Sequence, residues 1–132
     1  MTNHRSTMRY CLALDLVDDA ELIAAYERWH APGGVWPEIT ADVRARGGEH
    51  MEIWRIGTRM VMILEADEGF FTPRELPSRV TEWEALMSQY QVPVPGAAPG
   101  EKWRPMKRIY SLAEQGREAP EPASGDEGVD ER

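Results

Sequence analysis

Two spacings of apolar residues alternate along this chain of 132 residues, and their order restricts the fold more than any other feature. Alternation with a period of two predicts strands at residues 9–17, 49–56 and 103–112, and a continuous apolar run at 60–66 predicts the hairpin partner of the second strand. Spacings of three and four predict helices at residues 19–31 and 78–90, with a further helical piece that begins near Trp36. This order predicts an α+β fold of the ferredoxin-like βαββαβ type. We expect a four-stranded antiparallel sheet with helices on one face, and a homodimer that covers the other face.

Residues 20–38 place a histidine and a tyrosine on one side of the first predicted helix. Tyr26 and His30 are four residues apart and therefore lie one above the other. Pro32 and the two glycines after it end this helix and allow the chain to turn. Such a pair is often only part of a core. Here the five tryptophans of the chain favour a pocket for a small, partly polar ligand.

The negative charge of the chain is concentrated at its C-terminal end. Residues 113–132 hold seven acidic residues and two arginines, a net of −5, so the first 112 residues carry only −3 of the total −8. This balance argues against nucleic acid as a partner, because a phosphate-binding surface needs clustered Lys and Arg. The acidic, Pro- and Gly-rich residues 113–132 predict a disordered tail, and residues 1–8 a flexible leader. Residues 9–112 are then the folded domain.

Cys11 is the only cysteine, so neither an internal disulfide nor a multi-cysteine zinc site can form. A lone thiol suits a reducing cytoplasm. The polar N-terminus is followed by an apolar run of only strand length, which predicts neither a signal peptide nor a membrane span. His50 and Glu52 lie two apart on a predicted strand, but no further ligand follows at a recognisable spacing. We expect no metal and no cofactor.

The order of these motifs resembles that of the L-rhamnose mutarotase family, which includes proteins associated with L-fucose. The matching segments are RYCLALDL at residues 9–16, VWPE at 35–38, MEIWRIG at 51–57, WEALM at 83–87 and IYSL at 109–112. Tyr26 and His30 lie between the first and the second of them. The resemblance covers about residues 9–112. It implies a dimeric α/β barrel of ferredoxin-like units, which interconverts the anomers of a 6-deoxyhexose without metal or cofactor.

The resemblance also implies roles for particular residues. His30 corresponds to the catalytic histidine, and Tyr26 to the substrate-binding tyrosine four residues before it. Trp83 corresponds to a substrate-binding aromatic residue of the second helix of the fold. A sugar-binding tyrosine of the rhamnose enzymes corresponds to Met51, and the second member of their tryptophan pair corresponds to Glu84. These two differences bear on the identity of the sugar more than on the reaction.

The residues suit this chemistry by themselves. Opening a pyranose ring needs one group that protonates the ring oxygen and another that takes the proton of the anomeric hydroxyl, and closure on the other carbonyl face reverses both transfers. A histidine with an ordinary pKa near 6.5 can do either at neutral pH. Candidate walls for the sugar are Trp36, Trp54, Trp83 and Trp103, although core packing explains each of them about equally well.

Two other functions remain open on the same fold. One is a cofactor-independent oxygenase that acts on aromatic substrates, since its pocket would also suit a histidine and several tryptophans. The other is a sugar-binding domain without catalysis. The spacing of Tyr26, His30 and Trp36 favours the mutarotase. Oxygen uptake, or tight sugar binding without any effect on rate, would select the alternatives.

Overall fold

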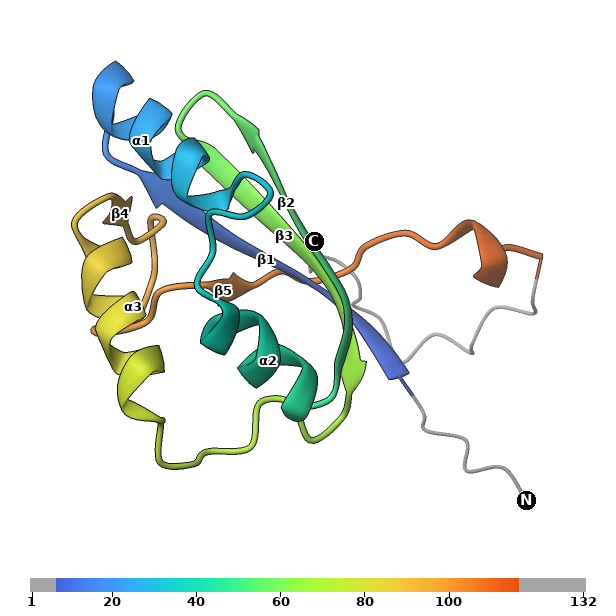
Figure 1. The fold of residues 1–132 in the computed structure, drawn as a ribbon. Coiled ribbons are helices and arrows are strands. Elements are labelled where there is room, and N and C mark those ends of the chain that lie inside the picture. Colours follow the sequence, from blue (N-terminus) through green and yellow to red (C-terminus); the bar gives the residue numbers. More distant parts are fainter. Residues whose placement is uncertain (1–6, 117–132) are drawn as a thin grey trace.

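The computed structural model describes residues 7–116, and its centre is an antiparallel sheet with three helices on one side (Figure 1). The elements in chain order are β1 (Thr7–Leu16), α1 (Ala20–His30), α2 (Pro37–Ala45), β2 (Gly48–Ile56), β3 (Arg59–Asp67), α3 (Ser78–Ser88), β4 (Gln91–Val92), β5 (Arg104–Pro105) and a 3₁₀ turn (Leu112–Glu114). The strand order is β2-β3-β1-β4, and β5 also pairs with β1. The predicted ferredoxin-like class, with one helical layer on an antiparallel sheet, is confirmed.

Local sequence fixes both ends of α1. The Asp19 side chain accepts hydrogen bonds from the main-chain N–H groups of Glu21 and Leu22, each at 3.0 Å, and so caps the helix. After His30 the chain turns back sharply. A Cβ atom on Gly34 would lie 2.6 Å from the carbonyl oxygens of Arg28 and Trp29, so only glycine fits there. The close turn lets α2 follow almost directly after α1.

The two faces of the sheet differ in what covers them. Leu12, Leu14 and Leu16 of β1 point toward the helices and are almost fully buried. The sequence left open which face of β2 is inward. Met51 and Ile53 pack against the helical core, whereas Trp54, on the opposite side of the strand, is 62% exposed. The core therefore lies between the sheet and the helices, and the other face of the sheet is open.

The last predicted strand is wrong over most of its length. Only Arg104–Pro105 form β5, on the outer edge of β1, where a proline that lacks an N–H group is tolerated. The sequence also did not predict β4, which forms because α3 ends at Ser88 rather than at Tyr90. After β5, residues 106–111 form an extended arm that leads away from the body of the molecule (Figure 1).

The expected terminal segments lie mostly outside the described residues. β1 begins at Thr7, within the segment predicted to be a leader, and the 3₁₀ turn at Leu112–Glu114 reaches into the acidic segment. Nothing further is described of residues 1–6 and 117–132. Among residues 7–116, no helix has the length and apolar composition needed to cross a membrane.

Candidate active site

A cavity of about 600 Å³ lies between the inner face of the sheet and the helices. Its size is typical of a small-molecule site. The chain segments around it supply different chemistry: α1 gives Tyr26 and His30, α3 gives Trp83 and Glu84, β2 gives Met51, and the segments after α3 give Gln91 and Trp103. A cavity with apolar walls and a few polar groups can bind and orient a small polar molecule.

His30 is the last residue of α1, and its ring is half-buried at the cavity. Its Nδ1 atom lies 2.8 Å from the main-chain carbonyl oxygen of Tyr26. A carbonyl oxygen can only accept, so Nδ1 carries the proton and Nε2 keeps a lone pair. Burial lowers the pKa of His30 below its ordinary value, and the bond to Tyr26 opposes this only in part. His30 is therefore held as a neutral base.

Tyr26 is buried, with 4% of its surface exposed, and lies directly beside His30. The centroids of the two rings are 4.3 Å apart. The Tyr26 hydroxyl accepts a hydrogen bond from Gln91 Nε2 at 3.1 Å, which leaves its own proton to donate elsewhere. Burial raises the pKa of Tyr26, so the phenol stays protonated at neutral pH.

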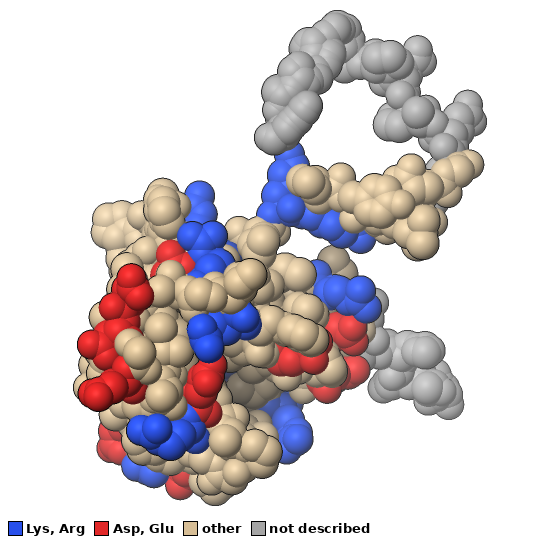
Figure 2. All heavy atoms as spheres, turned by 90° about the horizontal axis from the view of Figure 1, so that it is seen from above, with Lys and Arg blue, Asp and Glu red and all other residues tan. Residues whose placement is uncertain are grey.

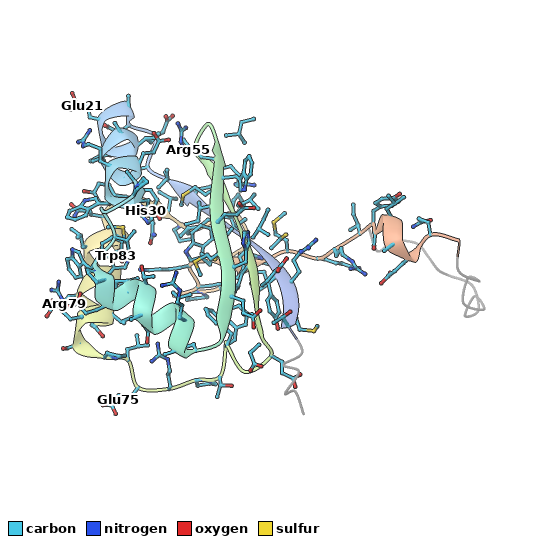
Figure 3. The ribbon with its side chains drawn as sticks, turned by 45° about the vertical axis from the view of Figure 1, so that its right-hand side comes forward. Glu21, His30, Arg55, Glu75, Arg79 and Trp83 are labelled. Carbon is cyan, nitrogen blue, oxygen red and sulfur yellow. The ribbon has the colours of Figure 1, made fainter. Side chains whose placement is uncertain are left out.

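Trp83 is the centre of an aromatic cluster behind this pair. Its ring meets those of Trp29, His30 and Trp36 edge to face, at centroid distances of 5.8, 5.8 and 5.1 Å. Figure 3 shows His30 and Trp83 close together between helices and sheet, whereas the labelled Glu21 and Glu75 point outward. The aromatic packing fixes the orientation of the Trp83 ring at the cavity.

Residues 93–103 form a loop that delivers Trp103 to the cavity from the other side. Lys102 Nζ holds the end of this loop on α3, since it donates to Ser88 Oγ at 2.7 Å and to the Glu84 carbonyl oxygen and Oε1, both at 3.3 Å. Trp103 packs against both halves of the core. The position of Trp103 therefore depends on the contacts that Lys102 makes with α3.

The far end of the cavity is lined by charged residues of α2 and its C-terminal turn. Asp42 pairs with Arg74 at 2.6 Å and with Arg46 at 3.3 Å. The Arg46 guanidinium lies 4.1 Å from the centroid of the Phe70 ring. The two arginines around Asp42 thus leave this end polar, in contrast to the aromatic end at His30.

A second cavity of about 350 Å³ lies on the β2 side of the same pair. It is lined by Tyr26, Glu27, His30, Ile53, Trp54, Arg55 and Met60. The Arg55 side chain closes part of it by an ion pair with Glu27 at 2.7 Å. The side chain of His30 therefore lines both cavities.

The model of one protein family, described as L-rhamnose mutarotase, matches residues 9–112. The chain belongs to the L-rhamnose mutarotase family. An L-fucose mutarotase of Xanthomonas campestris pv. campestris is 46% identical over 114 residues, which cover 83% of this chain and 91% of that protein. The resemblance stated from the sequence is thereby confirmed, and this family member is an enzyme of the isomerase class.

Two further proteins are similar to this mutarotase family member. A UPF0734 protein of Dictyostelium discoideum is 35% identical over 113 residues, covering 78% of this chain and 88% of that protein. The crystal structure of an L-rhamnose mutarotase from Formosa agariphila superimposes with a TM-score of 0.57 at 16% identity, covering 80% of this chain and 98% of that chain. Similarity at this identity shows a shared fold.

The structure of this family member brings together most of the residues predicted from its sequence. Tyr26, His30, Met51, Trp83 and Trp103 all line the large cavity. The other two predicted wall residues do not. Trp36 packs on Trp83 and carries the Arg79 guanidinium 3.8 Å from the centroid of its own ring. Trp54 is 62% exposed and contributes only to the lining of the smaller cavity.

Two groups near this site carry no signal in the spacing of residues: Gln91 in the short strand β4, and Lys102 in the loop before β5. Neither segment has a regular period. The one signal for Gln91 was its place directly after Tyr90, the last apolar residue of the predicted helix, which is buried in the structure. Glu84 was identified only as a difference from the family, and the structure shows its partner, Lys102.

Within residues 7–116, no group of three His, Cys, Asp or Glu side chains gathers in a way that could hold a metal ion. His50 Nε2 lies 3.6 Å from Glu52 Oε2 on β2, and both side chains are about half exposed. The pair is a surface contact in the part of the chain that the structure describes.

Proposed function

We propose that this enzyme interconverts the α and β anomers of a 6-deoxyhexose, L-fucose or L-rhamnose, by acid–base opening and closure of the sugar ring. The family supports the reaction class. The observation that carries the proposal is the pair of Tyr26 and His30 at the wall of the cavity, with the Nδ1 atom of His30 committed to a main-chain carbonyl. L-Fucose is the first sugar to test, because the relative with 46% identity is an L-fucose mutarotase.

His30 is the general base of the proposed reaction. Its Nε2 atom takes the proton of the anomeric hydroxyl as the bond between the anomeric carbon and the ring oxygen breaks. A lowered pKa keeps this nitrogen unprotonated at neutral pH. Positioned acid–base groups of this kind accelerate a reaction about 10²- to 10⁴-fold.

Tyr26 is the hydrogen-bond donor to the sugar. Because its oxygen accepts from Gln91, its proton points away from that amide and is available for a sugar oxygen. The ring oxygen gains a proton on opening, from Tyr26 or from water, and returns it on closure. Rotation of the open-chain aldehyde before closure exposes the other carbonyl face, which yields the other anomer.

The walls of the cavity select the sugar. Trp83 and Trp103 offer aromatic surface to the apolar side of the pyranose and to its methyl group. Met51 offers a flexible apolar side chain in the position that the sequence comparison assigned to a sugar-binding tyrosine. Trp36 supports Trp83 from behind and Trp54 lies near the second cavity, so both act on the sugar only through their neighbours.

The test is saturation-transfer NMR between the anomeric protons of equilibrated L-fucose and L-rhamnose, measured separately with and without the protein. Acceleration is expected for at least one of the two sugars, and the faster one is the substrate. If neither exchange rate changes, the proposed reaction is wrong for these sugars. Oxygen uptake with aromatic substrates would then select the oxygenase, and sugar binding without acceleration would select the non-catalytic domain.

The same proposal includes a homodimer in the cytoplasm. The open face of the sheet carries Trp54 and Ile56, which are 62% and 80% exposed in the single chain. Large apolar side chains at this exposure mark an interaction surface. The thiol of Cys11 has no disulfide partner, which suits a reducing compartment.

A further inference from the structure

The large cavity has two ends with different chemistry, and the proposed function uses only one of them. At the aromatic end, Tyr26, His30 and Trp83 line the place where the anomeric carbon would react. At the other end, Asp42 and Arg46 lie on the wall. The volume of about 600 Å³ falls within the range for drug-sized ligands, which are larger than a single pyranose. One sugar unit therefore leaves part of this cavity unused.

The two ends are separated along α2. Trp36, directly before α2, packs on Trp83 with the ring centroids 5.1 Å apart, which places the start of this helix at the aromatic end. Asp42 follows six positions later, and α2 runs away from the end of α1 (Figure 1). Asp42 therefore lies about 9 Å further along the helix axis. A pyranose ring is shorter than this distance, so a sugar that reacts at His30 leaves the Asp42 end free.

Asp42 and Arg46 form an ion pair at this end, and the hydrogen bonds of Arg46 are incomplete. The Asp42 side chain is only 10% exposed, and its Oδ2 atom accepts a hydrogen bond from Arg74 at 2.6 Å. Arg46 Nε lies 3.3 Å from the same oxygen, and the Arg46 guanidinium packs on the Phe70 ring. Within residues 7–116, this buried Nε atom has no hydrogen bond of good geometry. A buried donor without a partner is unfavourable, so a ligand oxygen at this end would stabilise the guanidinium.

The mixture of groups at this end selects a ligand that carries hydroxyls. A carboxylate only accepts hydrogen bonds and a guanidinium only donates them, whereas a hydroxyl does both. An anionic ligand would meet the charge of Asp42, and on the face shown in Figure 2 basic and acidic side chains lie side by side over much of the body. Phe71, which is 49% exposed, adds aromatic surface to the same cavity. Adjacent hydroxyls on a ring with an apolar side, the features of a sugar, match this set.

We propose that the Asp42 end of the cavity is a second sugar subsite, so that the enzyme also anomerises a 6-deoxyhexose that carries another sugar on a non-anomeric oxygen. This inference rests on the proposed function, because the free anomeric hydroxyl still lies at His30. The reducing sugar unit occupies the aromatic end, and the attached unit lies against Asp42 and Arg46. The bond between the two units stays closed, because the anomeric oxygen of the attached unit carries no proton for His30 to remove.

The first test compares disaccharides with their parent sugars. The probes are L-fucose and L-rhamnose that carry a glucosyl group on one of the non-anomeric hydroxyls, each linkage isomer taken separately. Saturation-transfer NMR over a range of concentrations gives kcat and KM. At least one isomer is expected to have a KM about tenfold below that of its parent, the effect of one hydrogen bond to a charged group. If no isomer has a higher kcat/KM than its parent, the subsite is wrong.

The second test removes the guanidinium. Arg46→Met keeps an unbranched side chain on the Phe70 ring, and Asp42 keeps its contact with Arg74. The advantage of the disaccharide over its parent should disappear in this variant. Arg28→Met, on the exposed side of α1, is the control and should keep the advantage. An advantage that persists in Arg46→Met would overturn the proposal. If thermal unfolding shows that Arg46→Met is not folded, Arg46→Lys replaces it, and a smaller advantage is expected because the planar fork is lost.

Binding separates this inference from the proposed reaction. Quenching of tryptophan fluorescence gives a Kd without any turnover. The wild type should bind the preferred disaccharide about tenfold more tightly than its parent, and Arg46→Met should bind the two equally. Tighter binding of the disaccharide with no anomerisation of any sugar would keep the subsite and overturn the proposed function. Anomerisation of the parent sugar with no preference for a disaccharide in either assay would overturn the subsite alone.

Discussion

The Nδ1 atom of His30 lies 2.8 Å from the carbonyl oxygen of Tyr26, one helical turn earlier. The two residues thus interact through a hydrogen bond from the His30 ring to the Tyr26 main chain and through the contact of their tilted rings. The hydrogen bond decides the tautomer of His30 and leaves Nε2 as the atom that can exchange a proton with a ligand.

Replacing His30 with Asn keeps a polar side chain of similar size at the end of α1 and removes the base. The anomeric exchange rate is expected to fall about 10²- to 10⁴-fold, toward the spontaneous rate. Saturation-transfer NMR measures it, and the unfolding temperature shows that the fold is intact. Arg28→Asn, on the exposed side of the same helix, is the control and should keep full activity. Full activity of His30→Asn would remove His30 from the mechanism.

The rate should depend on pH through the His30 imidazole. Burial lowers the pKa of His30 below its ordinary value of 6.5, so the neutral form persists to lower pH than in a free histidine. As pH falls through this lowered pKa, Nε2 is protonated and kcat/KM decreases. The acid limb of the rate profile is therefore expected below pH 6.5. A limb above that value would contradict a buried neutral base.

The same group links folding to pH. The unfolded chain protonates His30 near its ordinary pKa of 6.5, and the folded chain only at lower pH. The unfolded state thus binds more protons in this window, so the free energy of unfolding decreases as pH falls from about 6.5 through the folded-state pKa. Urea unfolding across this range measures the slope. His30→Asn should have a shallower slope than the wild type.

Gln91 orients the Tyr26 hydroxyl. Gln91→Leu removes the donor at 3.1 Å and leaves the phenol free to turn. A hydrogen bond of this kind is worth about 1 kcal/mol, which corresponds to a decrease of about fivefold in kcat/KM. Gln89→Leu makes the same change on an exposed neighbour and should have no effect on catalysis. If both variants lose activity equally, the loss comes from the end of α3 and not from Tyr26.

Lys102 and Glu84 hold the loop that carries Trp103. Lys102→Met should change stability by less than about 1 kcal/mol, because the pair is half exposed. Its larger effect is expected on KM, since a loose loop no longer holds Trp103 at the sugar. Steady-state kinetics separates KM from kcat. The charge-exchanged double variant Glu84→Lys/Lys102→Glu should recover part of the loss, because it restores the ion pair. A Lys102 that contacted the sugar directly would give no such recovery.

Gly34 permits the close turn between α1 and α2. In Gly34→Ala, the new Cβ atom would meet two main-chain oxygens at 2.6 Å, and main chain cannot move aside cheaply. We expect a loss of about 1–3 kcal/mol in the free energy of unfolding. Gly69→Ala is the control, because its nearest neighbours lie at 3.4 Å or more and its φ is not positive. Chemical denaturation of both variants measures the difference.

The sequence by itself determined the class of fold and the central pair of the site. Period-two and helical spacings are local properties, so β1, β2, β3 and the three helices were predicted nearly in place. Tyr26 and His30 were predicted for the same reason, since one helical turn aligns them whatever the rest of the chain does. Pro32 and the two glycines after it determined where helix α1 ends.

Only the tertiary structure decided which partners arrive from distant segments. Gln91 reaches Tyr26 across 65 positions, and Lys102 reaches Glu84 across 18, and neither contact leaves a periodic signal. The same holds for the last predicted strand. The alternation at residues 103–112 predicted a strand, but only Arg104–Pro105 form one, because the layer that covers a strand is set by long-range packing. The described part of the chain offers no such layer, and so the segment extends as an arm.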